Sequence, residues 1–462
     1  MARPERSQRS AAPAQPRGAA GATARRPLAW LLGLPLLLAL AWLASNLVDD
    51  RPQPRPAVLQ IDPTVSASAL TQALVALFAA AEPPAGGASP AAAGQAAAPP
   101  QLRPDTAPPM GCLRGQDCVA QWLAAMDDGT LAAQLRRQAL LAQRCQAAVA
   151  PTLQPGAQLD SVFTEPPDIA WRADRDIAPH GRGALQCHQL LIGQALLAAT
   201  AGDREVALRQ LALSDRLARA LVLGSRSLIS QAISWNLLHR HYHALAAVAQ
   251  RQPGWAAELL ALAPALLAEA LMPARWAAAE SSYQQVMFDA MPTGCAASSA
   301  GWADPGRWSD CLSGQVWLPE ANRQTAARQW LALLDRAAAA GPFQPPDAMT
   351  AARPGLWQHL HWRNTLGEWL LALGVPAYEP YALRQADVGL HQRALATALT
   401  ATAERWPAAE FSTRLAATAP PALVERIRLA DDGRALLAAR WSRSTVDGEP
   451  QPPLRVPLPA AP

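Results

Sequence analysis

One long apolar run near the N-terminus constrains this chain more than any other feature. Residues 27–48, PLAWLLGLPLLLALAWLASNLV, contain no charged side chain over 22 positions. A helix needs about 20 apolar residues to cross the hydrocarbon core of a bilayer, and Trp30 and Trp42 lie near the ends of the run, as interfacial aromatic residues do. The run predicts an uncleaved transmembrane anchor. A cleaved signal peptide, with ALA at 39–41 as its processing site, is the alternative.

The flanking charges orient the predicted anchor. Residues 1–26 hold six arginines and one acid, Glu5, whereas Asp49 and Asp50 follow the run. Because positive flanks stay in the cytoplasm, we expect the bulk of the chain on the outer face of the inner membrane, which is the periplasm in a bacterial cell. The whole chain has a net charge of +4, and residues 1–26 account for +5 of it. The rest of the chain therefore carries a net charge of −1. The bulk of the chain therefore lacks the basic surface that would indicate a nucleic-acid partner.

The composition favours helices and excludes several chemistries. Ala and Leu dominate the hydrophobic half of the chain, and β-branched residues are few. All 40 basic residues are arginine, which is typical of a GC-rich genome. The missing lysine excludes a Walker-type phosphate loop, Schiff-base chemistry and a Ser-Lys hydrolase. No pattern indicates a cofactor.

The chain divides into segments of different composition. Eight prolines and no apolar periodicity over residues 83–110 predict a flexible, extended linker that holds the folded part away from the membrane. The expected segments are a cytoplasmic Arg-rich tail (1–26), a transmembrane anchor (27–48), a juxtamembrane segment with a short helix (49–82), the Pro/Ala-rich linker (83–110), an α-helical extracytoplasmic domain (111–448) and a Pro-rich tail (449–462).

The fold class expected for the outer domain is mostly α, built from helical hairpins. Apolar residues at helical spacing on both sides of Gly202-Asp203 predict one antiparallel hairpin. Near the C-terminus, Asp432-Gly433 between two apolar runs predicts a small β-hairpin. Further helices are expected at 66–82, 129–150, 226–250, 254–271, 274–290, 320–340, 358–373 and 383–405.

Three stretches within 111–290 carry a resemblance to known proteins: CLRGQDCVAQWLA, GQALLAATAGDREVALRQL and SRSLISQAISWNLLHRHYHAL. They resemble uncharacterised membrane-anchored α-helical bacterial envelope proteins, which share an anchor, a short Cys-x5-Cys loop before a helix and a helical outer domain. The resemblance implies that architecture and no particular activity. The hairpin around Gly202 is also similar to a tetratricopeptide unit, but no second copy follows at a period of about 34 residues.

The cysteines are expected to form disulfides. An even number of cysteines beyond a predicted anchor, in an oxidising compartment, favours structural pairs. Proximity favours Cys112–Cys118 and Cys295–Cys311, which leaves Cys145–Cys187. The sequence contains neither a CxxC motif nor a Cys/His ligand box, so no pattern indicates a redox or metal-binding role for the cysteines. The six cysteines are Cys112, Cys118, Cys145, Cys187, Cys295 and Cys311.

Two groups of side chains are candidates for catalysis. His239 and His243 share a helix face and are a weak candidate metal pair, but Arg240 stands where the zinc-protease pattern needs Glu and no third ligand is evident. A solvated or core-edge role is the alternative. Glu280, inside an apolar helix, is a weak candidate general acid for a wall-cleaving enzyme. In the alternative interpretation, the Glu280 side chain is exposed to solvent or paired with an arginine such as Arg275.

The tryptophans around the predicted Cys295–Cys311 loop are a candidate binding surface. Trp302, Trp308 and Trp317 are aromatic anchors of the kind that bind glycans or proteins. A small disulfide-stapled core is the alternative.

The patterns taken together favour a non-catalytic interaction or scaffold module that contacts an envelope protein or the cell wall. No GxSxG elbow marks a common serine hydrolase. The alternative is a cell-envelope hydrolase, either wall-active through Glu280 or metal-dependent through His239 and His243.

Overall fold

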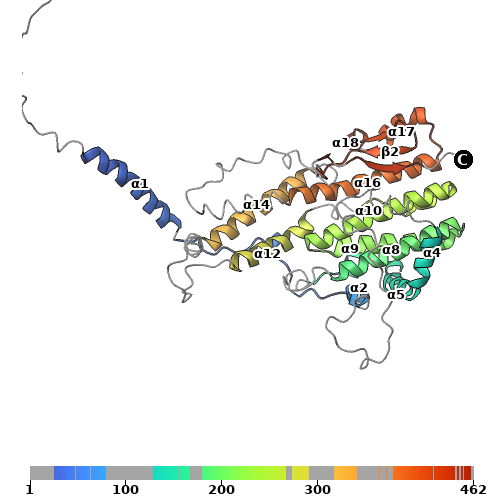
Figure 1. The fold of residues 1–462 in the computed structure, drawn as a ribbon, viewed down its shortest axis with the longest axis horizontal. Helices are drawn as coiled ribbons and strands as arrows, with labels where there is room; N and C mark the ends of the chain where they lie inside the picture. The colour runs from blue at the N-terminus through green and yellow to red at the C-terminus, as the bar shows by residue number, and fades with distance from the viewer. Residues whose placement is uncertain are drawn as a thin grey trace, which may run out of the picture.

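The described part of the chain is mostly helical, as the composition predicts, with a small sheet near the C-terminus (Figure 1). The computed structural model describes residues 25–46, 48–62, 64–79, 128–154, 156–166, 179–266, 273–290, 317–340, 364, 371, 378–419, 421–442, 445–446, 449–450 and 452–458, with side chains in the first helix from Gly33 on. The helices are α1 (Arg25–Asn46), α2 (Ala69–Ala79), α4 (Asp128–Arg137), α5 (Ala139–Val149), α6 (Leu159–Val162), α8 (Pro179–Thr200), α9 (Arg204–Gly224), α10 (Leu228–Arg251), α11 (Ala256–Ala261), α12 (Ala274–Ala290), α14 (Pro319–Ala340), α16 (Glu379–Ala403), α17 (Phe411–Thr418) and α18 (Pro421–Val424). The strands are β1 (Ile427–Leu429), β2 (Ala435–Ala438), β3 (Thr445–Val446), β4 (Glu449–Pro450) and β5 (Leu454–Pro457).

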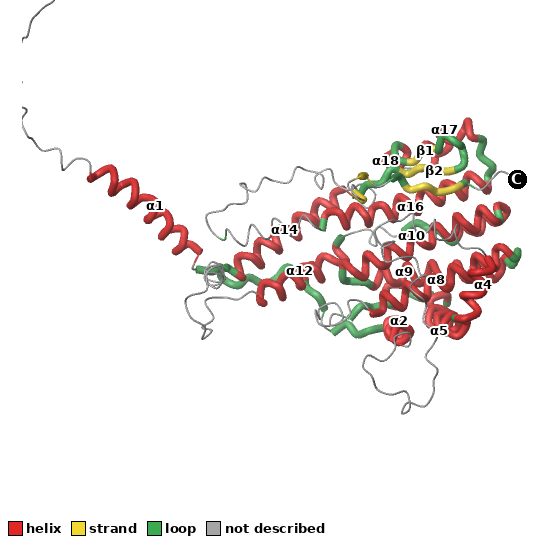
Figure 2. Tube along the Cα trace, in the orientation of Figure 1, coloured by secondary structure: helices red, strands yellow, loops and turns green. Residues whose placement is uncertain are grey.

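Helices α8, α9 and α10 follow one another through short turns and form the centre of the core, with α16 packed on α10 (Figure 2). The predicted hairpin between α8 and α9 is confirmed. Gly202 takes a φ of 75°, which a residue without Cβ adopts readily, and the Asp203 side chain caps α9 by accepting the Val206 N–H at 3.2 Å. One apolar core then joins these helices to their neighbours.

The helix predicted over 129–150 is two helices in the structure. The chain breaks at Gln138, whose φ of −111° and ψ of 18° are not helical, and α4 starts at Asp128. Both halves pack on α8, where Leu131 and Leu141 are buried. The break changes the direction of the second helix, so that each helix packs its own apolar side chains against α8. Local apolar periodicity does not predict such a break, because it depends on packing against another helix.

The C-terminal sheet is larger than the predicted hairpin. β1 and β2 are antiparallel and turn at Asp432-Gly433, where Gly433 has a φ of 66°, so the hairpin itself is confirmed. β5 adds a third antiparallel strand along β2, inside the predicted Pro-rich tail. Its Leu454 and Val456 alternate toward the core and are fully buried. The sheet covers α16 and touches α10 through β5.

The segments on either side of the predicted linker belong to one body. α2 begins after Ser68, whose Oγ accepts the Thr71 N–H, as its serine start predicts, and α2 packs closely on α8. At this crossing a side chain on Gly183 would collide with the Leu74 carbonyl oxygen. α4 packs on α8 as well. The chain therefore leaves and re-enters the same core around 83–110, a segment that lies outside the described residues.

The link between α1 and the body is the stretch directly after α1. The Asp49 carboxylate accepts the backbone N–H groups of Glu320 and Ala321 at 2.8 and 3.0 Å, which caps the start of α14. Arg55 then donates to the Ala278 carbonyl oxygen of α12 at 3.0 Å. In Figure 1, α1 accordingly projects from the end of the α12–α14 pair.

The predicted membrane anchor coincides largely with α1. α1 covers most of the apolar run that predicts it. Among the described residues, however, no helix combines the length and the apolarity that crossing a bilayer requires. The transmembrane helix of the predicted architecture is thus not found among them.

Candidate functional site

Three buried histidines meet between α10 and α16. His239 and His243, which share a face of α10 as their spacing predicts, lie against His391 of α16, with ring centroids 5.1 and 4.7 Å from its ring. The Nδ1 atoms of His239 and His391 are 2.8 Å apart, a hydrogen-bonding distance. All three side chains are at least 95% buried. His391 is the neighbour that the sequence could not identify, because it follows 152 positions after His239.

The histidine cluster is arranged for ring contact rather than for ligation. Burial holds the pKa values of His239 and His391 well below the ordinary range, and nearby positive charge from Arg440 acts in the same direction. The rings of His239 and His391 are therefore neutral at pH 7. Within the described part of the chain, no group of three or more His, Cys, Asp or Glu side chains is placed to hold a metal ion.

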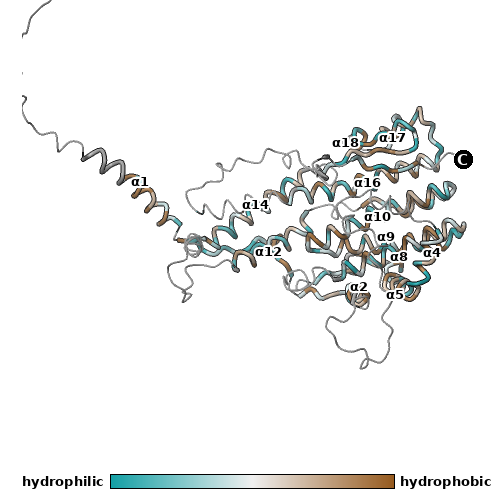
Figure 3. Tube along the Cα trace, viewed as in Figure 1, coloured by the Kyte–Doolittle hydropathy of each residue, from teal (hydrophilic) through white to brown (hydrophobic). Residues whose placement is uncertain are grey.

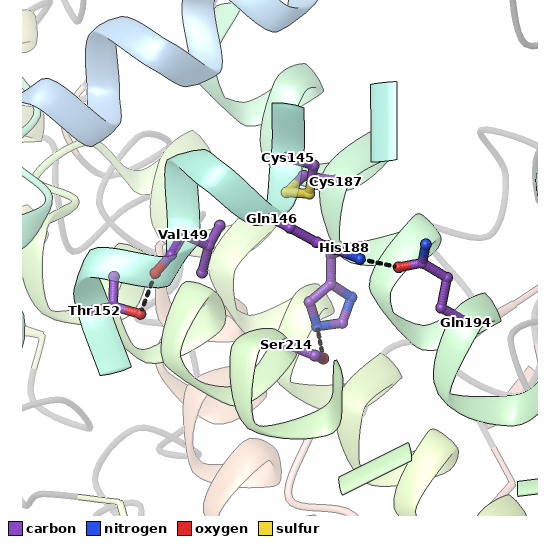
Figure 4. Close-up of a disulfide and its surroundings, with 8 residues drawn as sticks. All are labelled: Cys145, Gln146, Val149, Thr152, Cys187, His188, Gln194 and Ser214. Carbon is purple, nitrogen blue, oxygen red and sulfur yellow. Dashed lines mark hydrogen bonds between the residues drawn. A yellow bond between two sulfur atoms is a disulfide. The ribbon is translucent and has the colours of Figure 1, made fainter. Parts of the chain in front are cut away.

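A second buried network has the composition of a catalytic triad but not its accessibility. Ser214 Oγ lies between His188 Nε2 at 2.9 Å and His241 Nδ1 at 3.1 Å, and Asp215 Oδ1 is 3.8 Å from His241 Nε2. Ser214 and both rings are completely buried. A nucleophile must meet its substrate, so this network instead joins α8, α9 and α10. Figure 4 shows its His188–Ser214 contact beside the disulfide.

Glu280 of α12 caps α10. Its Oε1 accepts the Leu228 N–H at 3.0 Å, and the Tyr378 hydroxyl donates a second hydrogen bond to the carboxylate. Burial raises the pKa of Glu280, and these two hydrogen bonds partly offset that effect. Arg275, the partner that the sequence suggests for Glu280, donates to the Leu223 carbonyl oxygen.

Glu165 is the central residue that sequence reasoning missed. Its Oε2 accepts the backbone N–H groups of Arg226 and Ser227 at 2.6 and 2.9 Å, and its Oε1 accepts the hydroxyls of Ser227 and Ser230, each at 2.7 Å. The side chain is 1% exposed. It sits at the N-terminus of α10, where the helix dipole favours a negative charge. No local pattern marks it, because its partners lie about 60 positions later.

The one predicted disulfide whose two cysteines are described is confirmed. Cys145 of α5 and Cys187 of α8 are bonded, with Cα atoms 5.4 Å apart (Figure 4). Both are buried, so the bond fastens α5 to the centre of the core. The remaining cysteines, Cys112, Cys118, Cys295 and Cys311, lie outside the described residues.

The one described member of the tryptophan cluster is a core residue. Trp317 is 4% exposed, packs against Phe288 with ring centroids 5.7 Å apart, and donates its Nε1–H to the Phe288 carbonyl oxygen at 3.3 Å. It joins α12 to the start of α14. Trp302 and Trp308 lie outside the described residues.

The structure also has pockets and an exposed apolar stripe that the sequence did not indicate. A mostly apolar pocket of about 340 Å³ lies between α9 and the end of α11. A more polar pocket of about 410 Å³ lies beside the first turn of α12, with Arg226 and Arg275 in its wall. On α12, Tyr283, Val286 and Met287 are 39, 53 and 52% exposed.

Comparison with known proteins adds no relative to this picture: no protein-family model, no curated protein and no solved structure matches the chain.

Proposed function

We propose that this protein is a membrane-anchored, non-catalytic interaction module of the cell envelope. In this proposal α1 lies in the inner membrane with the N-terminus in the cytoplasm, and the helical body in the periplasm binds an envelope protein. The observation that carries it is the exposed apolar stripe on α12, formed by Tyr283, Val286 and Met287. The stretch after α1 contacts the same helix through Arg55.

The stripe has the properties of a docking surface. Its three residues follow i, i+3 and i+4 spacing, so they share one face of α12. Tyrosine and methionine are enriched in protein–protein interfaces. An ion pair between Arg323 and Asp289 fastens the last turn of α12 to the first turn of α14. The stripe is therefore presented on a braced helix pair, so that binding a partner would order little new structure.

The exposed leucines of α1 support the anchor. Leu34, Leu36, Leu37, Leu38 and Leu40 are 49–64% exposed in the isolated chain, and Figure 3 shows this part of α1 as hydrophobic. Exposed leucines all round a helix call for an apolar environment. We expect the full chain to stay in the membrane pellet after a high-salt wash, and its body to be digested by protease in spheroplasts but not in intact cells. Release by salt would contradict the anchor.

The hydrolase alternative has less support. The Glu280 carboxylate is occupied by two hydrogen-bond donors, and His239 and His243 are buried against His391. A catalytic group must reach the reacting atoms. These side chains instead join helices.

Photo-crosslinking in cells tests the interaction. A benzophenone amino acid at Val286 should give a discrete protein adduct, whereas the same residue at Glu205, an exposed position on α9, should not. Val286→Asp should then abolish co-purification of that protein and leave the melting temperature unchanged. Identical adducts from both positions, or co-purification that survives Val286→Asp, would overturn the proposal.

A further inference from the structure

The pocket of about 340 Å³ between α9 and the end of α11 is built like a small-molecule site. Such sites have volumes of about 300–1,000 Å³, with mainly apolar walls and a few convergent polar groups. Most of the lining here is apolar, and it comes from α9, from the end of α11 and from the chain around α6. The apolar lining includes Leu153, Leu159, Ala212, Val222 and Leu266.

One wall of the pocket is charged and firmly held. The side chains of Asp215 and Arg219 are only 8 and 10% exposed. Arg219 Nε donates to Asp215 Oδ1 at 2.7 Å, and its terminal nitrogens donate to the carbonyl oxygens of Pro264 and Ala265. Arg219 thus neutralises Asp215 and fixes the turn that forms the rim of the pocket. Each of its three nitrogens already donates one hydrogen bond within the protein, so we treat it as part of the wall.

Arg216 supplies the charge that remains. It lines the same pocket and is half-buried, and no ion pair between described residues includes it. His241, which lies 3.8 Å behind Asp215, adds no charge at neutral pH, because burial lowers its pKa. Asp215 and Arg219 cancel each other. The pocket therefore combines apolar walls with one net positive charge.

We propose that this pocket binds a small amphipathic anion: a compact apolar ring or short chain that carries one carboxylate or sulfonate group. The apolar part lies against lining leucines such as Leu159, Leu223 and Leu262, and the anionic group binds the Arg216 guanidinium. This inference is independent of the docking stripe on α12, because it uses other residues of other helices.

Titration of full-length protein with para-trifluoromethylbenzoate, followed by fluorine NMR, tests the proposal. Saturable binding at one site is expected. Arg216→Gln should weaken it about tenfold or more, since a hydrogen bond to a charged group contributes at least this much. The matched control is Arg209→Gln, which removes the same charge from an exposed position of the same helix outside the pocket. It should leave the affinity unchanged.

Two further comparisons separate the apolar and anionic parts of the site. Ala212→Phe fills the pocket and should abolish binding while the unfolding midpoint stays near that of the wild type; if this variant fails to fold, the pair of arginine variants decides. The neutral para-trifluoromethylbenzamide should bind the wild type about tenfold more weakly than the benzoate. Any of three results would overturn the proposal: no saturable binding, the same loss of benzoate affinity in both arginine variants, or equal affinities for the benzoate and the benzamide.

Discussion

Histidine is the residue type that this protein uses most unusually. Six histidines are at least 95% buried, and they lie where α8, α9, α10 and α16 meet. His180, His188, His239, His241 and His391 form hydrogen bonds that a leucine could not form, such as the bridge from His188 through Ser214 to His241. The buried six are His180, His188, His239, His241, His243 and His391.

Burial of these rings predicts a stability that falls in mild acid. The pKa values of His188, His239 and His391 are well below normal in the folded protein. Below pH ~6.5 the unfolded chain therefore binds protons that the folded chain does not, and each such histidine removes about 1.4 kcal/mol of unfolding free energy per pH unit. Asp387 and Glu280, whose pKa values burial raises, act in the opposite direction and reduce the net effect.

Urea midpoints between pH 8 and pH 5 measure this dependence. We expect them to be flat above pH ~7 and to fall below ~6.5. His391→Gln should reduce the slope by about one proton, whereas Arg209→Gln, at an exposed position, should not change it. An identical pH dependence in the wild type and in His391→Gln would show that this ring titrates in the folded state.

Glu165 is expected to be the most sensitive single carboxylate. Glu165→Ala leaves buried donors at the start of α10 without an acceptor, at about 1–3 kcal/mol each, so a loss of at least ~3 kcal/mol of unfolding free energy is expected. Glu165→Gln keeps one acceptor and should lose less. Glu205→Ala removes an exposed acid from the first turn of α9 and should cost under ~1 kcal/mol. Equal losses in the two alanine variants would refute the capping role.

At the scale of elements, the Cys145–Cys187 bond ties α5 to α8 across a sequence separation of 42 residues. Closing a loop of that length restricts the unfolded chain, which is worth about 2–4 kcal/mol. The double variant Cys145→Ala/Cys187→Ala should lose that much unfolding free energy in urea, with its helical circular dichroism retained. Stability equal to that of the wild type would mean that the bond does not restrict the unfolded chain.

The third strand should contribute to the core although it lies in a proline-rich tail. Leu454 pairs with Ala438 and is fully buried, so Leu454→Ala should cost about 2–5 kcal/mol. Its neighbour Arg455 points the other way, with its side chain 53% exposed, and Arg455→Ala should cost under ~1 kcal/mol. Similar losses for both variants would argue against the observed register.

At the scale of the whole molecule, the direction of α1 is set by bonds rather than by a tether. Besides Asp49, the Asn46 side chain accepts the Asn364 N–H at 2.6 Å. Spin labels at Leu38 on α1 and Arg336 on α14 should therefore give a narrow distance distribution. Asp49→Ala should broaden it, because the cap on α14 is lost, whereas Asp50→Ala keeps that cap. A broad distribution in the wild type would mean that α1 swings freely.

Local patterns determined much of the fold from the sequence alone. The helical composition, the turns at Gly202-Asp203 and Asp432-Gly433, and the serine before α2 all confirm predictions that depend on a few adjacent residues. Such features are predictable because backbone sterics and capping act over one turn of chain. The shared face of His239 and His243 on α10 was predictable in the same way, from their spacing in the sequence.

The tertiary structure alone decided which of these elements meet and what their polar residues do. Glu165, His391 and Asp49 acquire their roles from partners about 60, 152 and 271 positions away. The break at Gln138 likewise follows from packing on α8. A buried polar side chain must find a partner somewhere in the fold, but its own sequence neighbourhood does not say where. The candidate sites therefore became visible only once the helices were assembled.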